Sequence, residues 1–358
     1  SRSAKLIVCW PRCHRFLVDE PPQPIKRVGA RMSRRPRRST TRAGLGKDFL
    51  DLLSIPVEEL KGLLRLAAQL KAKQRRGVPH PLLPGRMLGL LFQKPSTRTR
   101  VSFEAGMNQL GGQAMVLPMG DIQLSRGETV ADTAHVLSRY LDAIVLRTFD
   151  HAIAEEWARE ASIPIINGLT DLNHPCQALS DLLTIQERKR RLKGIKIAYV
   201  GDGNNVTNSL IEAAAKTGMT IAVGCPPGYQ PDRRIVDLAR VEARQTGATI
   251  EIGADPCVAV KDADVVYTDV WISMGQEREQ AKRLKILAPY QLNARLLKYA
   301  KPDALVMHCL PAHRGEEISA EVLDGPQSVV FDQAENRLHM QKAILVRLLG
   351  KKSQTRRQ

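Results

Sequence analysis

Aromatic side chains are scarce in this 358-residue chain, where Phe, Trp and Tyr together make up 4%. Cysteine is also rare, with six residues, and no Cys-x-x-Cys pair or His/Cys cluster has the spacing of a zinc site. A chain of this length with so few cysteines does not form a disulfide scaffold, and we therefore expect a reducing compartment. Because the zinc spacings are missing, we also expect no structural metal. No uninterrupted apolar run approaches the length needed to cross a bilayer, and we therefore expect no membrane partner.

The charge of the chain lies mostly at its two ends. The formal net charge is +17, which by itself would suggest nucleic acid or an anionic substrate as a partner. Residues 1–43 carry 12 basic and 2 acidic side chains, and residues 351–358 carry four basic and no acidic ones. The body of the chain is therefore nearly balanced, which argues against nucleic acid as a partner. A basic nucleic-acid-binding protein stays open as the alternative function from a different class. Its 43% of apolar residues is enough for a sizeable core and suggests about two domains.

Residues 1–43 form a basic segment without a sustained hydrophobic period. We expect a disordered extension. A transit peptide is an alternative, because such peptides are rich in Arg and Ser and poor in acidic residues. The basic residues are not interleaved with aromatic ones, which argues against an arm that binds nucleic acid. The expected location is the cytoplasm, or an organelle matrix if the segment is a transit peptide.

Predicted strands and helices alternate from Lys47 onward, which indicates an α/β fold of two domains, each a parallel sheet flanked by helices. Buried strands are expected at residues 87–92, 143–146, 163–166, 195–200, 220–223, 264–268 and 304–307. Helices are expected from Ser54 as a cap, after residue 92, and over residues 177–191, 208–216 and 336–349. The domain boundary is predicted near residues 185–195, and the C-terminal helix is predicted to pack back on the first domain.

The segment Ser96-Thr97-Arg98-Thr99-Arg100 follows the first predicted strand. Hydroxyls and free backbone N–H groups at a helix start form a cradle for an anion, and a guanidinium adds a two-pronged contact to phosphate. Because Ser and Thr are also ordinary helix caps, this motif alone favours a phosphate site only modestly.

His174 and Gln177 lie three residues apart around a predicted helix start, so both side chains can point into one cleft. An imidazole can polarise a carbonyl oxygen, and the carbonyl of a Gln side chain can accept from an NH₂ group. The pair therefore suits a carbamoyl-sized group, although a lone His in a loop is more often structural than catalytic.

The loop Gly201-Asp202-Gly203-Asn204-Asn205 superficially resembles a dinucleotide-binding fingerprint. Val206 stands where the third glycine is required, and no acidic residue ends a following strand at the expected distance. We therefore do not expect NAD to bind. The loop follows a strand of a parallel sheet, where α/β proteins bind ligands, and Asn205 is placed to hold an amino-acid ligand.

Asp269 and Cys309 each follow a predicted strand of the second series. Asp269 is well placed to meet a cationic amine, with a helix cap as its competing role. A cysteine in the position of Cys309 is most often a small buried apolar residue, and it becomes a reactive candidate only beside a cation that favours the thiolate.

In this order and spacing, the motifs resemble the aspartate/ornithine carbamoyltransferase superfamily, and specifically its ornithine branch, over residues 46–350. Phe-x-Lys-Pro-Ser-Thr-Arg-Thr-Arg, starting at Phe92, is shared across that superfamily. Asp-x-x-x-Ser-Met-Gly, starting at Asp269, and His-Cys-Leu-Pro, starting at His308, mark the ornithine branch.

The resemblance implies transfer of the carbamoyl group of carbamoyl phosphate to the side-chain amine of L-ornithine, as in arginine biosynthesis, by a homotrimer without metal or organic cofactor. It implies a carbamoyl phosphate-binding domain over residues 44–188, an ornithine-binding domain over 189–335, a helix over 336–350 that returns to the first domain, and a basic tail over 351–358. Putrescine and N-acetylornithine remain alternative acceptors.

Carried over by position, the resemblance assigns carbamoyl phosphate to Ser96, Thr97, Arg98, Thr99, Arg147, His174, Gln177, Cys309, Leu310 and Arg337. It assigns ornithine to Asn205, Asp269, Ser273 and Met274, and catalytic contributions to Arg98, Arg147, His174, Asp269 and Cys309. Two routes for the proton of the attacking amine stay open: to the departing phosphate, or through Cys309.

Overall fold

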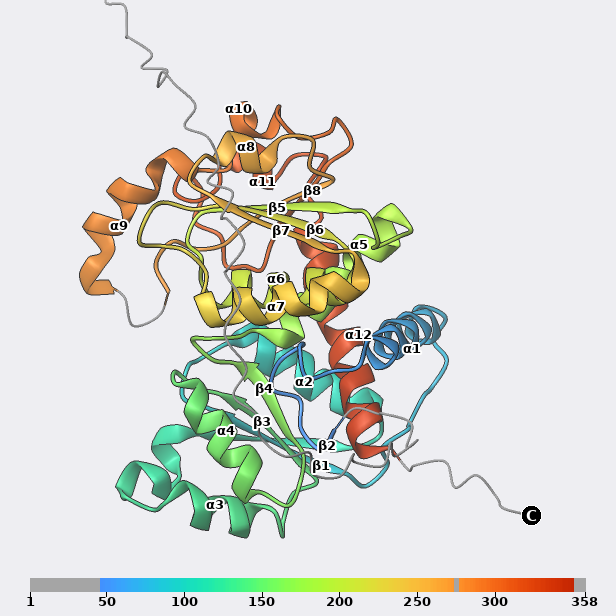
Figure 1. Cartoon of the computed structure of the whole chain (residues 1–358). Coiled ribbons are helices and arrows are strands. Elements are labelled where there is room, and N and C mark those ends of the chain that lie inside the picture. The colour runs from blue at the N-terminus through green and yellow to red at the C-terminus, as the bar shows by residue number, and fades with distance from the viewer. Residues whose placement is uncertain (1–45, 274–276, 351–358) are drawn as a thin grey trace, which may run out of the picture. The chain divides into compact units, whose positions relative to one another are not determined.

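The computed structural model describes residues 46–273 and 277–350. Over these ranges, nine strands form two parallel sheets (Figure 1), one with the strand order β2-β1-β3-β4 and one with the order β7-β6-β5-β8-β9. The predicted α/β architecture of two parallel sheets flanked by helices is thus confirmed. The extension predicted over residues 1–43 and the basic tail over 351–358 lie outside the described residues.

The first sheet is covered on both faces, as a parallel sheet requires. Its strands are β1 (Met87–Phe92), β2 (Gln113–Pro118), β3 (Ala143–Arg147) and β4 (Ile165–Leu169). Its helices are α1 (Val57–Arg75), α2 (Thr97–Gln109), α3 (Val130–Leu137) and α4 (His151–Glu160). Successive side chains of a strand point to opposite faces. Val145 accordingly packs into the core that also holds residues of α1 and α2, whereas Ile144 and Leu146 pack into a separate core with Trp157 of α4.

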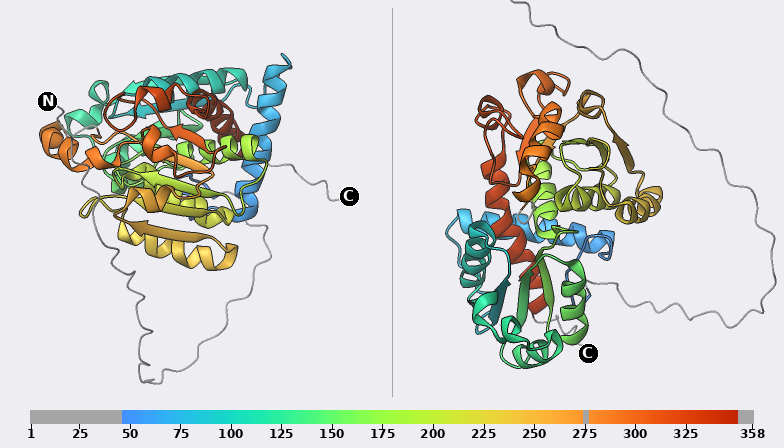
Figure 2. Two further views of the ribbon diagram at one scale, coloured as in Figure 1. Left: turned by 90° about the horizontal axis from the view of Figure 1, so that it is seen from above. Right: turned by 90° about the vertical axis from the view of Figure 1, so that its left-hand side faces the viewer.

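The second sheet has the same layered construction, with helices on both faces (Figures 1 and 2). Its strands are β5 (Lys196–Val200), β6 (Thr220–Gly224), β7 (Thr249–Gly253), β8 (Val265–Thr268) and β9 (Leu305–His308). Helices α6 (Asn205–Thr217) and α7 (Arg233–Thr246) lie on one face, and α8 (Pro256–Val260), α10 (Ala294–Leu297) and α11 (Ala320–Leu323) lie on the other. The other elements, apart from the two long helices described next, are helix α9 (Gln280–Leu287) and short 3-10 turns. These turns lie at Met119–Asp121, Gln123–Arg126, Glu277–Glu279 and Ala288–Tyr290.

Two helices join the sheets through a shared core. Helix α5 (Pro175–Lys189) links β4 to β5, and α12 (Val330–Leu349) packs against α1, α2 and α5 (Figure 1). One apolar cluster contains Val145 of the first sheet, Leu179 of α5, Ile344 of α12 and Tyr199 of the second sheet. The C-terminal helix therefore returns to the helices of the first sheet, as predicted. No helix within the described ranges has the length and hydropathy to span a lipid bilayer.

Several element boundaries differ from the predictions. Ser54 does not cap α1: the helix begins at Val57 after Pro56 without a side-chain cap, and the Ser54 amide donates to Asp51 at 2.7 Å. Helix α12 begins at Val330 rather than Asn336. The strand expected at residues 163–166 runs over Ile165–Leu169. Strands β2 and β7 were not predicted because they lie at sheet edges and bury their side chains only in part.

Candidate active site

A cavity of about 1110 Å³ lies where strands of both sheets end. Its wall comes from the last residue of β3 and from the segments that follow β1, β4, β5, β6, β8 and β9, at the edge where parallel α/β sheets bind ligands. The predicted site residues in this wall are Ser96, Thr97, Arg98, Arg147, His174, Asn205, Asp269, Ser273, Cys309, Leu310 and Arg337. Thr99 and Gln177 are buried and are not part of the wall, and Met274 lies outside the described residues.

The N-terminus of α2 forms the predicted anion cradle. Ser96 caps the helix, with its hydroxyl oxygen accepting from the Thr99 amide at 3.2 Å. The amides of Thr97 and Arg98 then open the helix, where backbone N–H groups have no partner within the helix and the helix dipole favours negative charge. The Thr99 hydroxyl does not contribute to this cradle, because its oxygen accepts a hydrogen bond from Arg337 Nη2 at 2.7 Å. Thr99 therefore orients a guanidinium of the site.

Three guanidiniums approach one another at this wall. The pKa of Arg147 is lowered to about 10, mainly by burial and in addition by the positive charges of Arg337 and Arg98. Burial is also the main cause of the lowered pKa of Arg337. The buried Nε atoms of Arg98, Arg147 and Arg337 have no hydrogen-bond partner among the described residues. A cluster of buried cations with free donors suits a ligand with negative charge and several acceptor oxygens.

His174 is neutral in this environment. Burial lowers its pKa well below the usual value, and the charges of Arg337, Arg147 and Arg98 act in the same direction. The ring lies at the start of α5, where Pro175 occupies the first helical position and the His174 amide donates to Ser209 at 2.8 Å. Its Nδ1 atom is buried without a partner in the described part of the chain. A neutral imidazole can donate one N–H to a carbonyl oxygen, which is the role predicted from the sequence.

The wall from the second sheet carries a carboxylate. Asp269 follows β8 and accepts from Asn204 Nδ2 at 2.7 Å and from Cys309 Sγ at 2.8 Å. Asn204 is itself held in place because it caps α6: its side-chain oxygen accepts hydrogen bonds from the amides of Val206 and Thr207. Asp269 is thereby fixed by two donors and offers an anionic contact for an amine.

Asn204 was not predicted as a site residue, whereas its neighbour Asn205 was. The side chain of Asn205 donates to the Thr170 carbonyl at 2.5 Å, so it ties the start of α6 to the segment after β4 while lining the cavity. Asn204 carries the contact to Asp269 instead. The helix was expected to begin at residue 208, so Asn204, which directly precedes its actual start at Asn205, was not recognised as the cap.

Backbone conformation and close packing require glycine at two positions of the loop after β5. Gly201 has a φ of +127°, a conformation that residues with a side chain rarely adopt. A Cβ atom on Gly203 would collide with the backbone of Gln230 and Pro231. These glycines therefore serve a tight turn and a close backbone approach, which explains the superficial likeness to a dinucleotide fingerprint.

Cys309 is a protonated thiol in this arrangement. Burial raises its pKa well above the usual value, and the adjacent Asp269 carboxylate raises it further, while Arg337 acts weakly in the opposite direction. The sequence hypothesis of a reactive cysteine required a neighbouring cation that favours the thiolate. Its nearest charged partner is instead an acid, to which the thiol donates a hydrogen bond.

A second group of charged side chains, also unpredicted, lies farther along the same wall. Arg283 of α9 pairs with Asp202, donates from Nε to the Trp271 carbonyl at 2.7 Å, and lies 4.9 Å from the centre of the Tyr229 ring. Burial raises the pKa of Asp202 to about 6 although Arg283 opposes this shift. These contacts fix α9 against the second sheet.

Two groups of described residues bring potential metal ligands within 4.8 Å of one another: Asp269 with His308 and Cys309, and His313 with Glu316 and Glu317. In the first group, His308 Nδ1 accepts from the Leu310 amide at 2.9 Å, and its Nε2 faces Glu317 at 3.1 Å. Both ring nitrogens of His308 thus have protein partners. The imidazole orients the turn that carries Cys309 and Leu310.

Comparison with known proteins gives consistent matches along the described chain. The model for the carbamoyl-P binding domain of aspartate/ornithine carbamoyltransferase matches residues 47–187, and the model for the Asp/Orn binding domain matches residues 193–348. The chain is 58% identical over 304 residues to the ornithine carbamoyltransferase of Geobacillus stearothermophilus, covering 85% of this chain and 97% of that protein. It is 55% identical over 305 residues to that of Pyrococcus abyssi, covering 85% and 96%.

Solved structures agree with this pattern. The ornithine carbamoyltransferase from Pyrococcus furiosus superposes with a TM-score of 0.84 at 54% identity, covering 86% of this chain and 98% of that one. The anabolic ornithine carbamoyltransferase from Campylobacter jejuni gives a TM-score of 0.80 at 40% identity, covering 85% and 99%.

Proposed function

The chain belongs to the aspartate/ornithine carbamoyltransferase family, and from that premise we propose that it transfers the carbamoyl group of carbamoyl phosphate to the side-chain amine of L-ornithine. The products are L-citrulline and phosphate, and the reaction is a step of arginine biosynthesis. One observation carries the proposal: a cluster of guanidiniums and an anchored carboxylate line the same cavity. The first suits a phosphate, and the second suits the amine of an amino acid.

Carbamoyl phosphate binds at the wall from the first sheet in this proposal. Ser96, Thr97 and the guanidiniums of Arg98 and Arg147 hold the phosphate oxygens, and Arg337, which Thr99 orients, contacts the carbamoyl group. His174 donates to the carbamoyl oxygen. The resemblance assigns the carbamoyl amino group to the oxygen of Gln177, which lies three residues farther along α5 and is buried behind the cavity wall. The negative charge of a bound phosphate group would offset the mutual repulsion of the three guanidiniums, which supports this assignment.

Ornithine binds at the wall from the second sheet. Asp269 meets an amino group of the substrate, Asn205 and Ser273 hold its amino-acid end, and Cys309 and Leu310 line the space next to the reacting carbon. The resemblance also assigns Met274 to ornithine, and this residue lies outside the described ranges. The support for this side is the anchored geometry of Asp269, which two donors fix in place.

The transfer requires a free amine. An alkylammonium group has a pKa near about 10.4, so roughly one molecule in a thousand is unprotonated at neutral pH. The amine nitrogen then forms a bond to the carbamoyl carbon while the bond from that carbon to the bridging oxygen breaks, and phosphate leaves with this oxygen. Arg98, Arg147 and His174 stabilise the negative charge that builds up on the oxygens. Holding both substrates in one cavity supplies proximity.

The proton of the amine goes to the departing phosphate rather than through Cys309. A thiol whose pKa is raised by burial and by Asp269 already carries its proton at neutral pH and cannot accept another. Phosphate, in contrast, gains basicity as its bond to the carbamoyl carbon breaks. Cys309 then acts by position, as a neutral donor to Asp269.

The domain division follows the same assignment. We assign carbamoyl phosphate to a domain over residues 44–188, ornithine to a domain over 189–335, and the returning helix to 336–350. A homotrimer and a cytoplasmic location are proposed on the family resemblance alone, and sedimentation of the purified protein measures the first.

Citrulline formation by the purified protein from carbamoyl phosphate and ornithine is the direct test. Putrescine and N-acetylornithine are assayed in parallel as alternative acceptors. We expect turnover with ornithine to exceed turnover with either alternative. Turnover with putrescine or N-acetylornithine but not with ornithine would contradict the proposal and assign a sister specificity.

A further inference from the structure

A buried carboxylate with no part in the reaction lies close to the carbamoyl site. Asp181 of α5 has no exposed surface. Its Oδ1 atom accepts from Gln177 Nε2 at 2.9 Å and from Gln333 Nε2 at 2.8 Å, and its Oδ2 atom accepts from the Tyr267 hydroxyl at 3.2 Å. These donors come from α5, α12 and β8, so Asp181 is the point at which three elements meet.

The carboxylate fixes the orientation of two amide groups. An ionised carboxylate only accepts hydrogen bonds, so each glutamine must turn its NH₂ group toward Asp181. For Gln333 this leaves the oxygen free to accept from the His308 amide at 3.0 Å, at the end of the strand that leads to Cys309. Gln177 is oriented in the same way, and its own oxygen is buried with no donor among the described residues.

Burial makes this arrangement depend on its donors. It raises the pKa of Asp181 to about 7, while hydrogen bonds from Gln177, Gln333 and Tyr267 and the charge of Arg337 oppose the shift. With a pKa of about 7, Asp181 is ionised in about half of the molecules at neutral pH, and without these donors the ionised fraction would be smaller. Loss of the negative charge would remove the reason for the Gln177 amide to keep one orientation.

We propose that Asp181 is a positioning residue that holds the Gln177 oxygen toward the amino group of carbamoyl phosphate. The site thereby selects a carbamoyl group over an acyl group of the same shape that lacks an N–H donor. The inference rests on the proposed function, because it assigns Gln177 to the carbamoyl group. A Gln177 amide in the opposite orientation would place its NH₂ against the amino group of the substrate, with no acceptor between them.

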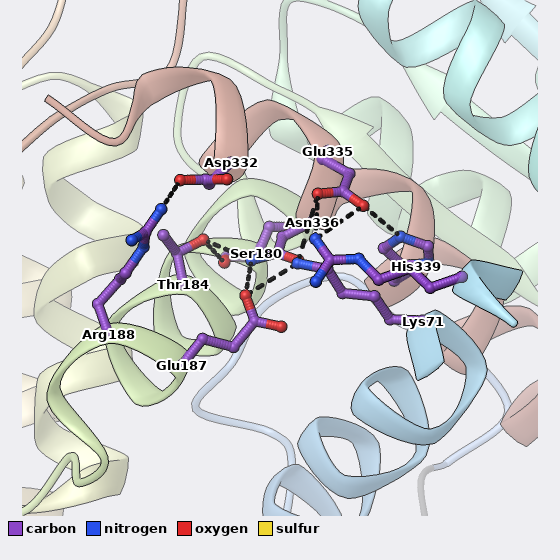
Figure 3. Close-up of polar contacts among 10 residues, drawn as sticks. Lys71, Ser180, Thr184, Glu187, Arg188, Asp332, Glu335, Asn336 and His339 are labelled. Carbon is purple, nitrogen blue, oxygen red and sulfur yellow. Dashed lines mark hydrogen bonds and ion pairs between the residues drawn. The ribbon is translucent and has the colours of Figure 1, made fainter. Parts of the chain in front are cut away.

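A second polar cluster on the same two helices offers a matched control (Figure 3). Glu187 of α5 accepts from Lys71 Nζ at 2.9 Å and from Asn336 Nδ2 at 2.8 Å, and Asn336 also donates to Thr184 at 2.9 Å. This cluster joins α1, α5 and α12 through a carboxylate, as Asp181 joins its neighbours, and none of the hydrogen bonds just described involves Gln177. The change Glu187→Gln therefore matches Asp181→Asn in chemistry and in helix interface.

The experiment compares carbamoyl phosphate with acetyl phosphate, in which a methyl group replaces the amino group. For each variant, the KM for carbamoyl phosphate and the inhibition constant of acetyl phosphate are measured in the citrulline assay. The preference for carbamoyl phosphate is the inhibition constant of acetyl phosphate divided by the KM for carbamoyl phosphate. We expect Asp181→Asn to lower this ratio by about tenfold, because one hydrogen bond is lost or reversed. The inhibition constant of inorganic phosphate, which contacts only the guanidinium side, should stay within about threefold.

Tyr267→Phe is the second variant, because it removes one donor to Asp181 and leaves the packing almost unchanged. It should shift the preference in the same direction by a smaller factor, and it carries the test if Asp181→Asn does not fold. An unchanged preference in the folded variants would overturn the inference, and so would an equal shift in Glu187→Gln. A wild-type protein that forms no citrulline would instead contradict the proposed function.

Discussion

The two walls of the cavity differ in whether their polar groups already form hydrogen bonds within the protein. On the wall from the first sheet, buried nitrogen atoms of Arg98, Arg147, Arg337 and His174 have no hydrogen-bond partner in the described chain. On the wall from the second sheet, Asp269 is held by two donors. The first wall therefore gains more from an anionic ligand than the second gains from an amine, and the two walls should respond differently to mutation and to ligands.

Removal of a guanidinium from the first wall should have the largest effect. We expect Arg98→Ala to lower kcat/KM for carbamoyl phosphate by roughly 10²–10³-fold, the range for loss of one preorganised donor to a developing oxyanion. The matched control is Arg100→Ala on the same helix, since Arg100 is exposed and its one ion pair within the described ranges is with Glu104, at 3.4 Å. Steady-state citrulline kinetics measure both variants, and circular dichroism checks that each is folded. Near-normal kinetics for Arg98→Ala would show that the phosphate site is assigned wrongly.

Neutralising the carboxylate of the second wall should separate the two substrates. We expect Asp269→Asn to lower kcat/KM for ornithine by about 10–100-fold, because a hydrogen bond to a charged group contributes about 1.5–3 kcal/mol. Binding of carbamoyl phosphate, measured by calorimetry in the absence of ornithine, should change little. Equal losses for both substrates would contradict the division of the cavity into two walls.

Removing the thiol tests the route of the proton. Because the raised pKa of Cys309 keeps it protonated, Cys309→Ala deletes a donor to Asp269 but no base. We expect kcat to fall by about tenfold at most, in keeping with one lost hydrogen bond, and the pH dependence of kcat to keep its shape. A loss of several hundredfold together with a shifted pH profile would restore Cys309 as the proton carrier.

Ligands should stabilise the protein unequally. Inorganic phosphate at about 100 times its Kd should contribute about 2.7 kcal/mol of stability, and the melting temperature should rise by several degrees. Ornithine alone, at the same concentration as phosphate, should raise it less, because the second wall is already hydrogen-bonded and is expected to bind its ligand more weakly. Differential scanning fluorimetry measures both shifts. A larger shift with ornithine than with phosphate would reverse the comparison between the walls.

The sequence predicted the central strands and most of the candidate residues that line the cavity for one physical reason. Strands buried on both faces form continuous apolar runs, such as 87–92 and 195–200, and polar residues directly after them must meet at one edge of the sheet. Arg98, His174 and Asp269 could be placed in this way. The edge strands β2 and β7 could not, because their partial exposure leaves no such run.

The supporting contacts of the site were not predictable from the sequence. Asp181 and Gln333 are far apart in the chain and meet only through the packing of α5 against α12. The pairing of Asp202 with Arg283 likewise depends on where α9 lies. Local patterns report which side chains follow a strand, whereas the partners that orient them are set by tertiary packing.

Binding of a bisubstrate analogue, in which a phosphonate is joined through a carbonyl group to the side-chain amine of ornithine, tests the account most directly. Calorimetry gives its Kd for the wild-type protein and for the Arg98→Ala and Asp269→Asn variants. We expect tight binding to the wild type and a Kd raised at least tenfold by each change alone, because one molecule must contact both walls. If either variant binds the analogue as tightly as the wild type does, the two walls do not face a common ligand.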